Sequence, residues 1–215
     1  MYDSNTIQEA IKLVISEIRG KEEKANSEIK VGVSQRHVHL SREDLNTLFG
    51  EGYELTVKKY LMGREFASDE FVTLVGPSLK AIEKVRVLGP VRKQTQVEIS
   101  RTDTFVLKVS PPVRPSGELK GSASLVLVGP KGTVYLKEGV IIANRHIHLT
   151  PEYAEKHGIK DNDYVDVEVE GIKPTKFYDV QVRVRDDFNV EMHIDTDDAN
   201  SAALKNGANV RIIRK

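Results

Sequence analysis

The chain has 215 residues and no cysteine. It can therefore form no disulfide scaffold and offers no cysteine nucleophile, although this absence says nothing about the redox compartment. Charge of one sign is also not in excess, because 32 basic residues balance 32 acidic ones. A net charge near zero gives no general attraction to nucleic acid or to an anionic membrane, although local basic clusters can still bind phosphate. We expect neither nucleic acid nor a membrane as a partner.

Long apolar runs are missing as well. No run in the sequence approaches the ~20 residues that are needed to span a bilayer. The N-terminus lacks the basic, apolar and small-residue regions of a signal peptide. A cytoplasmic location is therefore expected. A chain of this length can form one domain or two small ones, and an internal duplication favours two.

The duplication is seen in two near-copies of one motif, Ser34–Ser41 (SQRHVHLS) and Ala143–Thr150 (ANRHIHLT). The motif alternates apolar and polar residues, which predicts a β-strand on which both histidines share one face. The two pairs are His37 with His39 and His146 with His148. A single such pair could simply be polar residues at a sheet surface. The repetition of the flanking residues favours a duplicated metal site, since zinc accepts neutral histidine nitrogens.

A second internal similarity supplies a third donor in each half. Gln96–Asp103 (QVEISRTD) resembles Glu191–Asp198 (EMHIDTDD), and Glu98 and His193 fall at matching places. The predicted metal ligands are His37, His39 and Glu98 in one half, and His146, His148 and His193 in the other. Three protein ligands with an open position are typical of catalytic zinc, whereas structural zinc sites close all four positions. The remaining His157 precedes a glycine, which predicts a helix end and a surface role.

An amphipathic helix is predicted over Thr6–Arg19, where apolar residues recur at helical spacing. It ends at Gly20, and residues 21–27 form a charged linker without an apolar anchor. Such a helix can mediate dimerisation, dock onto a partner, or cover its own barrel. The loose linker favours docking.

From residue 28 onward, short alternating strands are broken by glycine and proline at intervals of about 8 to 12 residues, which predicts a sandwich or barrel. The expected strands are Ile29–Val33, Phe71–Val75, Val85–Leu88, Gln94–Ile99, Leu125–Val128, Val140–Ile142, Tyr164–Val169, Tyr178–Val184, Val190–Ile194 and Val210–Ile213. A small helix is expected after each histidine motif, because Ser41 and Thr150 can cap an acidic first turn.

Arg92 is the candidate anion-binding residue. It follows Gly89-Pro90, a bend that would let the backbone approach a ligand closely, and a period of two would place it on the same strand face as Glu98. A guanidinium suits phosphate because its planar fork donates two parallel hydrogen bonds. The alternative is an ordinary surface arginine. The other Gly-Pro pairs, at residues 76–77 and 129–130, are expected to be plain turns.

The histidine motifs, Leu88–Arg92 (LGPVR), Gln96–Asp103 and Glu191–Asn200 (EMHIDTDDAN) together make the chain resemble the PduL-type phosphotransacylases, also called phosphate propanoyltransferases. The resemblance covers about residues 28 to 213. It implies a mainly β fold of two duplicated β-barrel domains with short capping helices. It also implies that residues 36–143 form the first barrel, and that residues 28–35 and 144–215 form the second.

The resemblance further implies reversible acyl transfer between coenzyme A and phosphate, with propanoyl-CoA and acetyl-CoA as substrates. It assigns two Zn²⁺ per chain to the six predicted ligands, and phosphate to Arg92 as the catalytic residue. Positions similar to coenzyme A contacts in the family are Ser34, Lys59, Arg86, Leu88 and Asn200. In members that serve propanediol degradation inside bacterial microcompartments, an N-terminal helix is an encapsulation tag, and residues 1–27 fit that description. Shell or cargo proteins are then expected partners. The helix and the long exposed strands favour a homodimer.

The mechanism expected from these residues needs no cysteine or serine nucleophile. Phosphate is already an anion near neutral pH, so orientation can supply much of the rate. We expect one zinc and Arg92 to hold phosphate, and the other zinc to stabilise the departing thiolate. Two alternatives stay open. A zinc hydrolase would cleave the thioester with water, and a non-catalytic metal-binding module would serve as a scaffold.

Overall fold

The computed structural model describes residues 9, 12–15 and 28–213. Residues 9 and 12–15 are helical, and the rest of the predicted N-terminal helix and its linker lie outside the described residues. The encapsulation role assigned to residues 1–27 therefore stays a prediction. Within the described part of the chain, no helix has both the length and the apolar character needed to cross a membrane.

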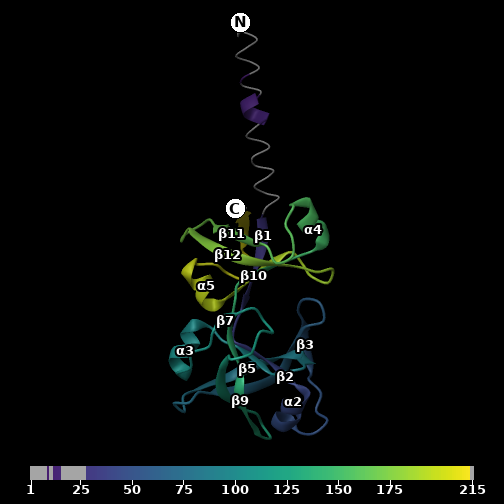
Figure 1. Ribbon diagram of the computed structural model, residues 1–215, viewed down its shortest axis with the longest axis vertical. Coiled ribbons are helices and arrows are strands. Elements are labelled where there is room, and N and C mark those ends of the chain that lie inside the picture. The colour runs from purple at the N-terminus through teal and green to yellow at the C-terminus, as the bar shows by residue number, and fades with distance from the viewer. Residues whose placement is uncertain (1–8, 10–11, 16–27, 214–215) are drawn as a thin grey trace.

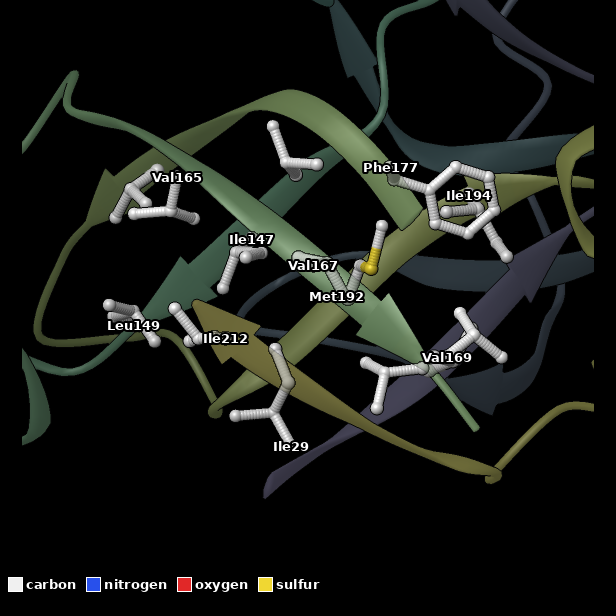
Figure 2. Packing of buried hydrophobic residues seen from close by; sticks show 14 of the residues in the cluster. Ile29, Ile147, Leu149, Val165, Val167, Val169, Phe177, Met192, Ile194 and Ile212 are labelled. Atoms are coloured by element: carbon white, nitrogen blue, oxygen red, sulfur yellow. The ribbon is translucent and has the colours of Figure 1, made fainter. Parts of the chain in front are cut away.

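One closed barrel contains strands from both ends of the chain, in the order β1-β13-β10-β12-β11-β14. These strands are β1 (Glu28–Ser34), β10 (His146–Leu149), β11 (Tyr164–Val169), β12 (Thr175–Val184), β13 (Glu191–Asp195) and β14 (Asn209–Ile213). β1 pairs with β13 in parallel and with β14 antiparallel, so it closes the barrel. Ile147, Val167 and Met192 are fully buried in the core, and Figure 2 shows them with their neighbours.

A second barrel closes through β4-β5-β2-β6-β9-β8 and back to β4. Its strands are β2 (His37–Ser41), β4 (Phe66–Val75), β5 (Ala81–Arg92), β6 (Gln96–Glu98), β8 (Ala123–Val128) and β9 (Thr133–Ala143). Two short strands, β3 (Val57–Tyr60) and β7 (Val113–Arg114), extend the sheet beyond the barrel. The sequence did not predict them, because all four residues of β3 are exposed and carry no buried face. The two barrels lie one above the other along the long axis of the molecule (Figure 1).

The barrels are two copies of one topology. β2 runs parallel to β5 and antiparallel to β6, and β10 runs parallel to β12 and antiparallel to β13. β6 is parallel to β9, as β13 is to β1. Each barrel has its own core of buried apolar side chains. The predicted fold class, mainly β with two duplicated barrels, is confirmed, while the exact domain limits stay predictions.

Short helices follow the ligand-bearing strands. They are α2 (Arg42–Phe49), α3 (Arg101–Leu107), α4 (Pro151–Lys156) and α5 (Thr196–Ser201). The predicted helices after the histidine motifs are α2 and α4, with Ser41 and Thr150 as their N-caps. The helices α3 and α5 were not expected from the sequence. A capping box of Ser100 with Asp103 begins α3, and this pattern could have revealed the helix from sequence.

Candidate active site

Strand alternation places the histidines on the outer faces of their barrels. Val38 and Ile147, the residues between the histidines of each pair, are fully buried in the two cores. Their neighbours on the strand must therefore point away from those cores. This outer face is itself covered in the first barrel, where His37 is 9% exposed and His39 is 2% exposed.

The first cluster contains the three donors predicted for this half. Cross-strand pairing sets His37 directly opposite Glu98, on β2 and β6. His37 Nε2 lies 3.4 Å from Glu98 Oε2. One donor atom from each of His37, His39 and Glu98 can be chosen so that all three lie within 4.8 Å of one another.

The second cluster has the same construction. His146 on β10 lies opposite His193 on β13, just as His37 lies opposite Glu98. The donor atoms of His146, His148 and His193 also lie within 4.8 Å of one another. The rings of His146 and His193 are stacked, with centroids 5.3 Å apart. The structure thus brings together all six residues that were predicted as ligands, in the two predicted groups.

The first histidine of each pair is held in one tautomer. His37 Nδ1 lies 2.8 Å from the carbonyl oxygen of Gln35, and His146 Nδ1 lies 2.9 Å from that of Asn144. Because a carbonyl oxygen can only accept, Nδ1 must carry the proton and donate it. The lone pair is then on Nε2, the nitrogen that is left for a cation.

The pKa values of four predicted ligands, His39, Glu98, His146 and His148, favour the forms that ligate a metal. Burial lowers the pKa of His39 well below its usual range, lowers that of His146 to about 4, and lowers that of His148 further. Burial alone would raise the pKa of Glu98, but the charge and hydrogen bond of His37 outweigh it and bring the pKa below its ordinary value. His37 is the exception, because burial is outweighed by the charge and hydrogen bond of Glu98, which raise its pKa, so a proton must leave this ring when a cation binds. Neutral imidazoles and an ionised carboxylate are the forms that bind a cation.

One buried nitrogen supports the fit of a cation directly. His39 Nδ1 is buried and has no hydrogen-bond partner among the described residues. A desolvated polar atom without a partner costs free energy, which a bound group at the cluster would offset. Nitrogen and carboxylate donors in this number are also the set that zinc takes in catalytic sites. The residues present therefore fit a metal ion in each cluster.

The arginine that precedes each histidine pair has a structural role that the sequence analysis did not assign. Arg36 Nε donates to both carboxylate oxygens of Asp103 at 2.9 Å, and the side chain of Asp103 is almost fully buried. Arg145 Nη1 lies 2.8 Å from Asp198 Oδ1. Each arginine thus ties its histidine strand to the helix that follows the third donor of the same barrel.

A carboxylate that the sequence analysis missed stands beside the second cluster. Glu191 Oε2 lies 3.3 Å from His193 Nε2, a buried nitrogen with no well-aligned hydrogen bond among the described residues. A Cβ added to Gly32 on the neighbouring β1 would lie 3.1 Å from Glu191 Cδ, so the glycine leaves room for this carboxyl group. Glu191 sits two residues before His193, and the period of two could have revealed it.

Arg92 lies near the first cluster, but it lies on a different strand from the one predicted. β5 ends at Arg92 and β6 begins at Gln96, so the prediction that Arg92 and Glu98 share one strand is wrong. The chain reverses between them, and β2 lies between the two strands in the sheet. Arg92 Nη2 lies 2.6 Å from Glu65 Oε1, and Nη1 donates to Ser116 Oγ at 3.2 Å.

At Gly89-Pro90, where a bend was expected, the space that a side chain of residue 89 would take is filled. β5 continues through both residues, and Gly89 faces the ring of Phe66, with which any added Cβ would collide. The need for a glycine here comes from side-chain packing within the barrel. The expected approach of a ligand to the backbone here stays a prediction.

The predicted coenzyme A contacts lie in different parts of the molecule. Arg86 and Leu88 on β5 are paired in register with His37 and His39, so they border the first cluster. The Arg86 guanidinium lies over the ring of Phe71 and donates to the carbonyl oxygen of Ser68.

Of the other three predicted contacts, Ser34 lines a small pocket together with His37 and Glu98. Ser34 ends β1, where its hydroxyl contacts the carbonyl oxygen of Ile194 at 3.3 Å. Lys59 on β3 and Asn200 on α5 are exposed. His157 is the C-cap of α4, as its place before glycine predicted, and its ring stacks on Tyr153.

Comparison with known proteins agrees with this architecture. Residues 30–205 match the family model of phosphate propanoyltransferase. A phosphate propanoyltransferase of Lachnoclostridium phytofermentans is 50% identical over 98% of this chain and 100% of its own length. One from Thermotoga maritima is 59% identical over 86% of this chain and 89% of its own length, and one from Priestia megaterium is 47% identical over 95% and 94%. The chain therefore belongs to the phosphate propanoyltransferase family and is an acyltransferase.

Proposed function

We propose that the chain interconverts a short-chain acyl-CoA and phosphate with an acyl phosphate and coenzyme A, and that it holds two zinc ions, one in each cluster. The observation that carries the proposal is the pair of equivalent three-donor clusters, one on each barrel. The names of the relatives support phosphate and a propanoyl group as the reactants. The nearby arginine adds a group suited to the phosphate anion.

We infer that the two clusters are close enough to act together. The negative charge of Glu98 in the first cluster raises the pKa of His146 in the second, against the larger lowering by burial. The sulfur of Met62, from the loop between β3 and β4, lies 2.9 Å from His148 Nδ1. A substrate that binds between the barrels would meet donors from both halves. This placement suits a reaction in which an anion and a thioester must be held side by side.

Arg92 is the residue that we assign to phosphate. Its two terminal nitrogens are already oriented, because Nη1 donates to Ser116 Oγ, and Ser116 in turn accepts from Gln96 Nε2 at 2.8 Å. Gln96 is fixed from its other end by the backbone N–H of Gly117, which donates to Gln96 Oε1 at 2.8 Å. A guanidinium held in this way can orient phosphate without first ordering itself.

Phosphate needs orientation more than deprotonation, because it is an anion near neutral pH. When bound, zinc would supply Lewis acidity and a site that accepts the departing thiolate, which would lower the barrier to cleavage of the thioester C–S bond. The sequence contains no cysteine for an acyl-enzyme, and we propose direct attack by a phosphate oxygen on the thioester carbonyl. Arg86 and Leu88 border the first cluster and are the positions that we assign most readily to coenzyme A.

The test is the release of thiol from propanoyl-CoA, measured with and without phosphate in untreated and chelator-treated protein. We expect release that depends on phosphate and is lost on chelation, with recovery when zinc is returned. Release without phosphate would indicate a thioesterase instead. Full phosphate-dependent activity in demonstrably metal-free protein would remove the metal from the mechanism.

A further inference from the structure

The tip of the β3–β4 hairpin, residues 61–65, reaches both halves of the site. Two backbone hydrogen bonds close it, from Leu61 N to the Glu65 carbonyl oxygen at 2.9 Å and from Glu65 N to the Met62 carbonyl oxygen at 3.1 Å. The tip belongs to the first barrel, but the sulfur of Met62 contacts His148 of the second. A Cβ added to Gly63 would lie 3.2 Å from Asp187 Oδ2, also in the second barrel.

The last residue of this tip holds the arginine assigned to phosphate. Glu65 Oε1 lies 2.6 Å from Arg92 Nη2, a distance typical of a charge-assisted hydrogen bond. Nη1 of the same guanidinium is engaged by Ser116. Both terminal nitrogens of Arg92 therefore have partners within the chain, and only one of these partners is an anion.

Carboxylate and phosphate recognise a guanidinium by the same chemistry, since both accept hydrogen bonds from its planar fork. They cannot take the same N–H at once, and two anions that crowd one cation repel each other. The Glu65 side chain is 44% exposed and that of Arg92 is 30% exposed. Water competes at a pair this open, so the pair is weak enough for a substrate anion to displace.

We propose that Glu65 is a specificity-determining residue, whose carboxylate occupies the anion position of Arg92 until inorganic phosphate displaces it. This inference rests on the proposed assignment of phosphate to Arg92. Glu65 then raises the phosphate concentration that the enzyme requires, without changing how acyl-CoA binds. Its displacement frees one end of a tip that also contacts His148 through Met62, so the phosphate site is linked to the second barrel.

The experiment compares wild type, Glu65→Gln and Glu54→Gln in the zinc-loaded full chain. Glutamine keeps the size of the side chain but removes the charge. Glu54 is a matched control, because it pairs with Arg42 on the surface of the same barrel and its loss changes the net charge equally. The Michaelis constants for phosphate and for propanoyl-CoA are measured separately, together with the thermal shift caused by phosphate alone.

We expect Glu65→Gln to lower the Michaelis constant for phosphate by about two- to five-fold, the range that corresponds to an exposed ion pair. The constant for propanoyl-CoA should not change, and phosphate alone should give a larger thermal shift. Glu54→Gln should behave as wild type. The inference is overturned if the phosphate constant of Glu65→Gln is unchanged or higher, or if both substrates shift together.

The variant Arg92→Ala distinguishes a failure of the role of Glu65 from a failure of the phosphate assignment to Arg92. A raised phosphate constant in Arg92→Ala, with no decrease in Glu65→Gln, would reject the role of Glu65 and leave the phosphate assignment intact. An unchanged phosphate constant in Arg92→Ala would reject that assignment itself, and the inference with it.

Discussion

At the scale of single residues, the two histidine pairs are positioned by short local contacts. Backbone carbonyls of Gln35 and Asn144 fix the tautomer of His37 and His146, so the donor nitrogen is chosen before any ligand arrives. The arginines that precede these histidines act on the scaffold through buried or half-buried aspartates. Each motif thus combines donor atoms with the groups that hold them.

His146→Ala should halve the zinc content of the purified protein, because the second cluster loses one of its three donors while the first is unaltered. Elemental analysis by mass spectrometry measures this directly. His157→Ala is the control, since His157 lies outside both clusters. An unchanged zinc content in His146→Ala would remove this residue from the ligand set.

The six donors could be predicted from sequence because a strand repeats its facing every two residues, and because the second copy showed which neighbours matter. The position of Arg92 could not be predicted in the same way. The chain turns after Arg92 and returns as β6 on the far side of β2, so spacing along the sequence no longer reports the facing. The contact of Glu65 with Arg92 could not be predicted either, because only the folded hairpin brings the two residues together.

At the scale of elements, the short helices are positioned by their N-caps and by glycines against which helix ends pack. Ser41 and Thr150 accept hydrogen bonds from the first turns of α2 and α4. Gly76 and Gly129 lie against the backbone of Leu107 in α3 and of Leu48 in α2. The two Gly-Pro segments are turns, as expected, but they are also contact surfaces for helix ends, which dipeptide composition does not reveal.

Gly76→Ala should destabilise the protein by about 2–3 kcal/mol, because the new methyl group would collide with the carbonyl oxygen of Leu107 and neither backbone can move freely. Urea unfolding followed by circular dichroism measures the change. Ser78→Ala, at an exposed position of the same turn, should stay within about 0.5 kcal/mol of wild type. Equal stability of the two variants would show that the turn is not closely packed on α3.

At the scale of the whole molecule, the two barrels are joined by more than a linker. β1 leaves the second barrel and leads directly into the histidine strand β2 of the first. Asp197 at the start of α5 accepts from the backbone N–H of Thr102 at 2.6 Å and from its hydroxyl at 2.8 Å, which ties α5 to α3. These connections fix the position of one barrel, and of the cluster on it, relative to the other.

Residues 144–215 alone should not fold cooperatively, because without β1 the edges of β13 and β14 are unpaired and the core lacks Ile29 and Val31. Joining residues 28–35 to the C-terminus through a short linker should restore folding, since β1 and β14 are antiparallel neighbours. Amide dispersion in NMR spectra and urea unfolding compare the two fragments. Cooperative unfolding of residues 144–215 without β1 would contradict the role given to this strand.

The number of barrels was predictable, since duplicated motifs and regular turns are both visible in the sequence. Composition and periodicity alone did not distinguish a sandwich from a barrel, and the resemblance of the long motifs to a known family made that choice. The strands without a buried face, β3 among them, escaped prediction because alternation is the pattern that marks a strand.

We propose that both clusters bind zinc and that both ions are required for acyl transfer. The most direct test returns zinc stepwise to chelated protein and follows phosphate-dependent thiol release from propanoyl-CoA. We predict that the rate rises until two equivalents of zinc per chain are bound, one for each cluster. A full rate in metal-free protein, or a rate that is maximal with one equivalent bound, would contradict it.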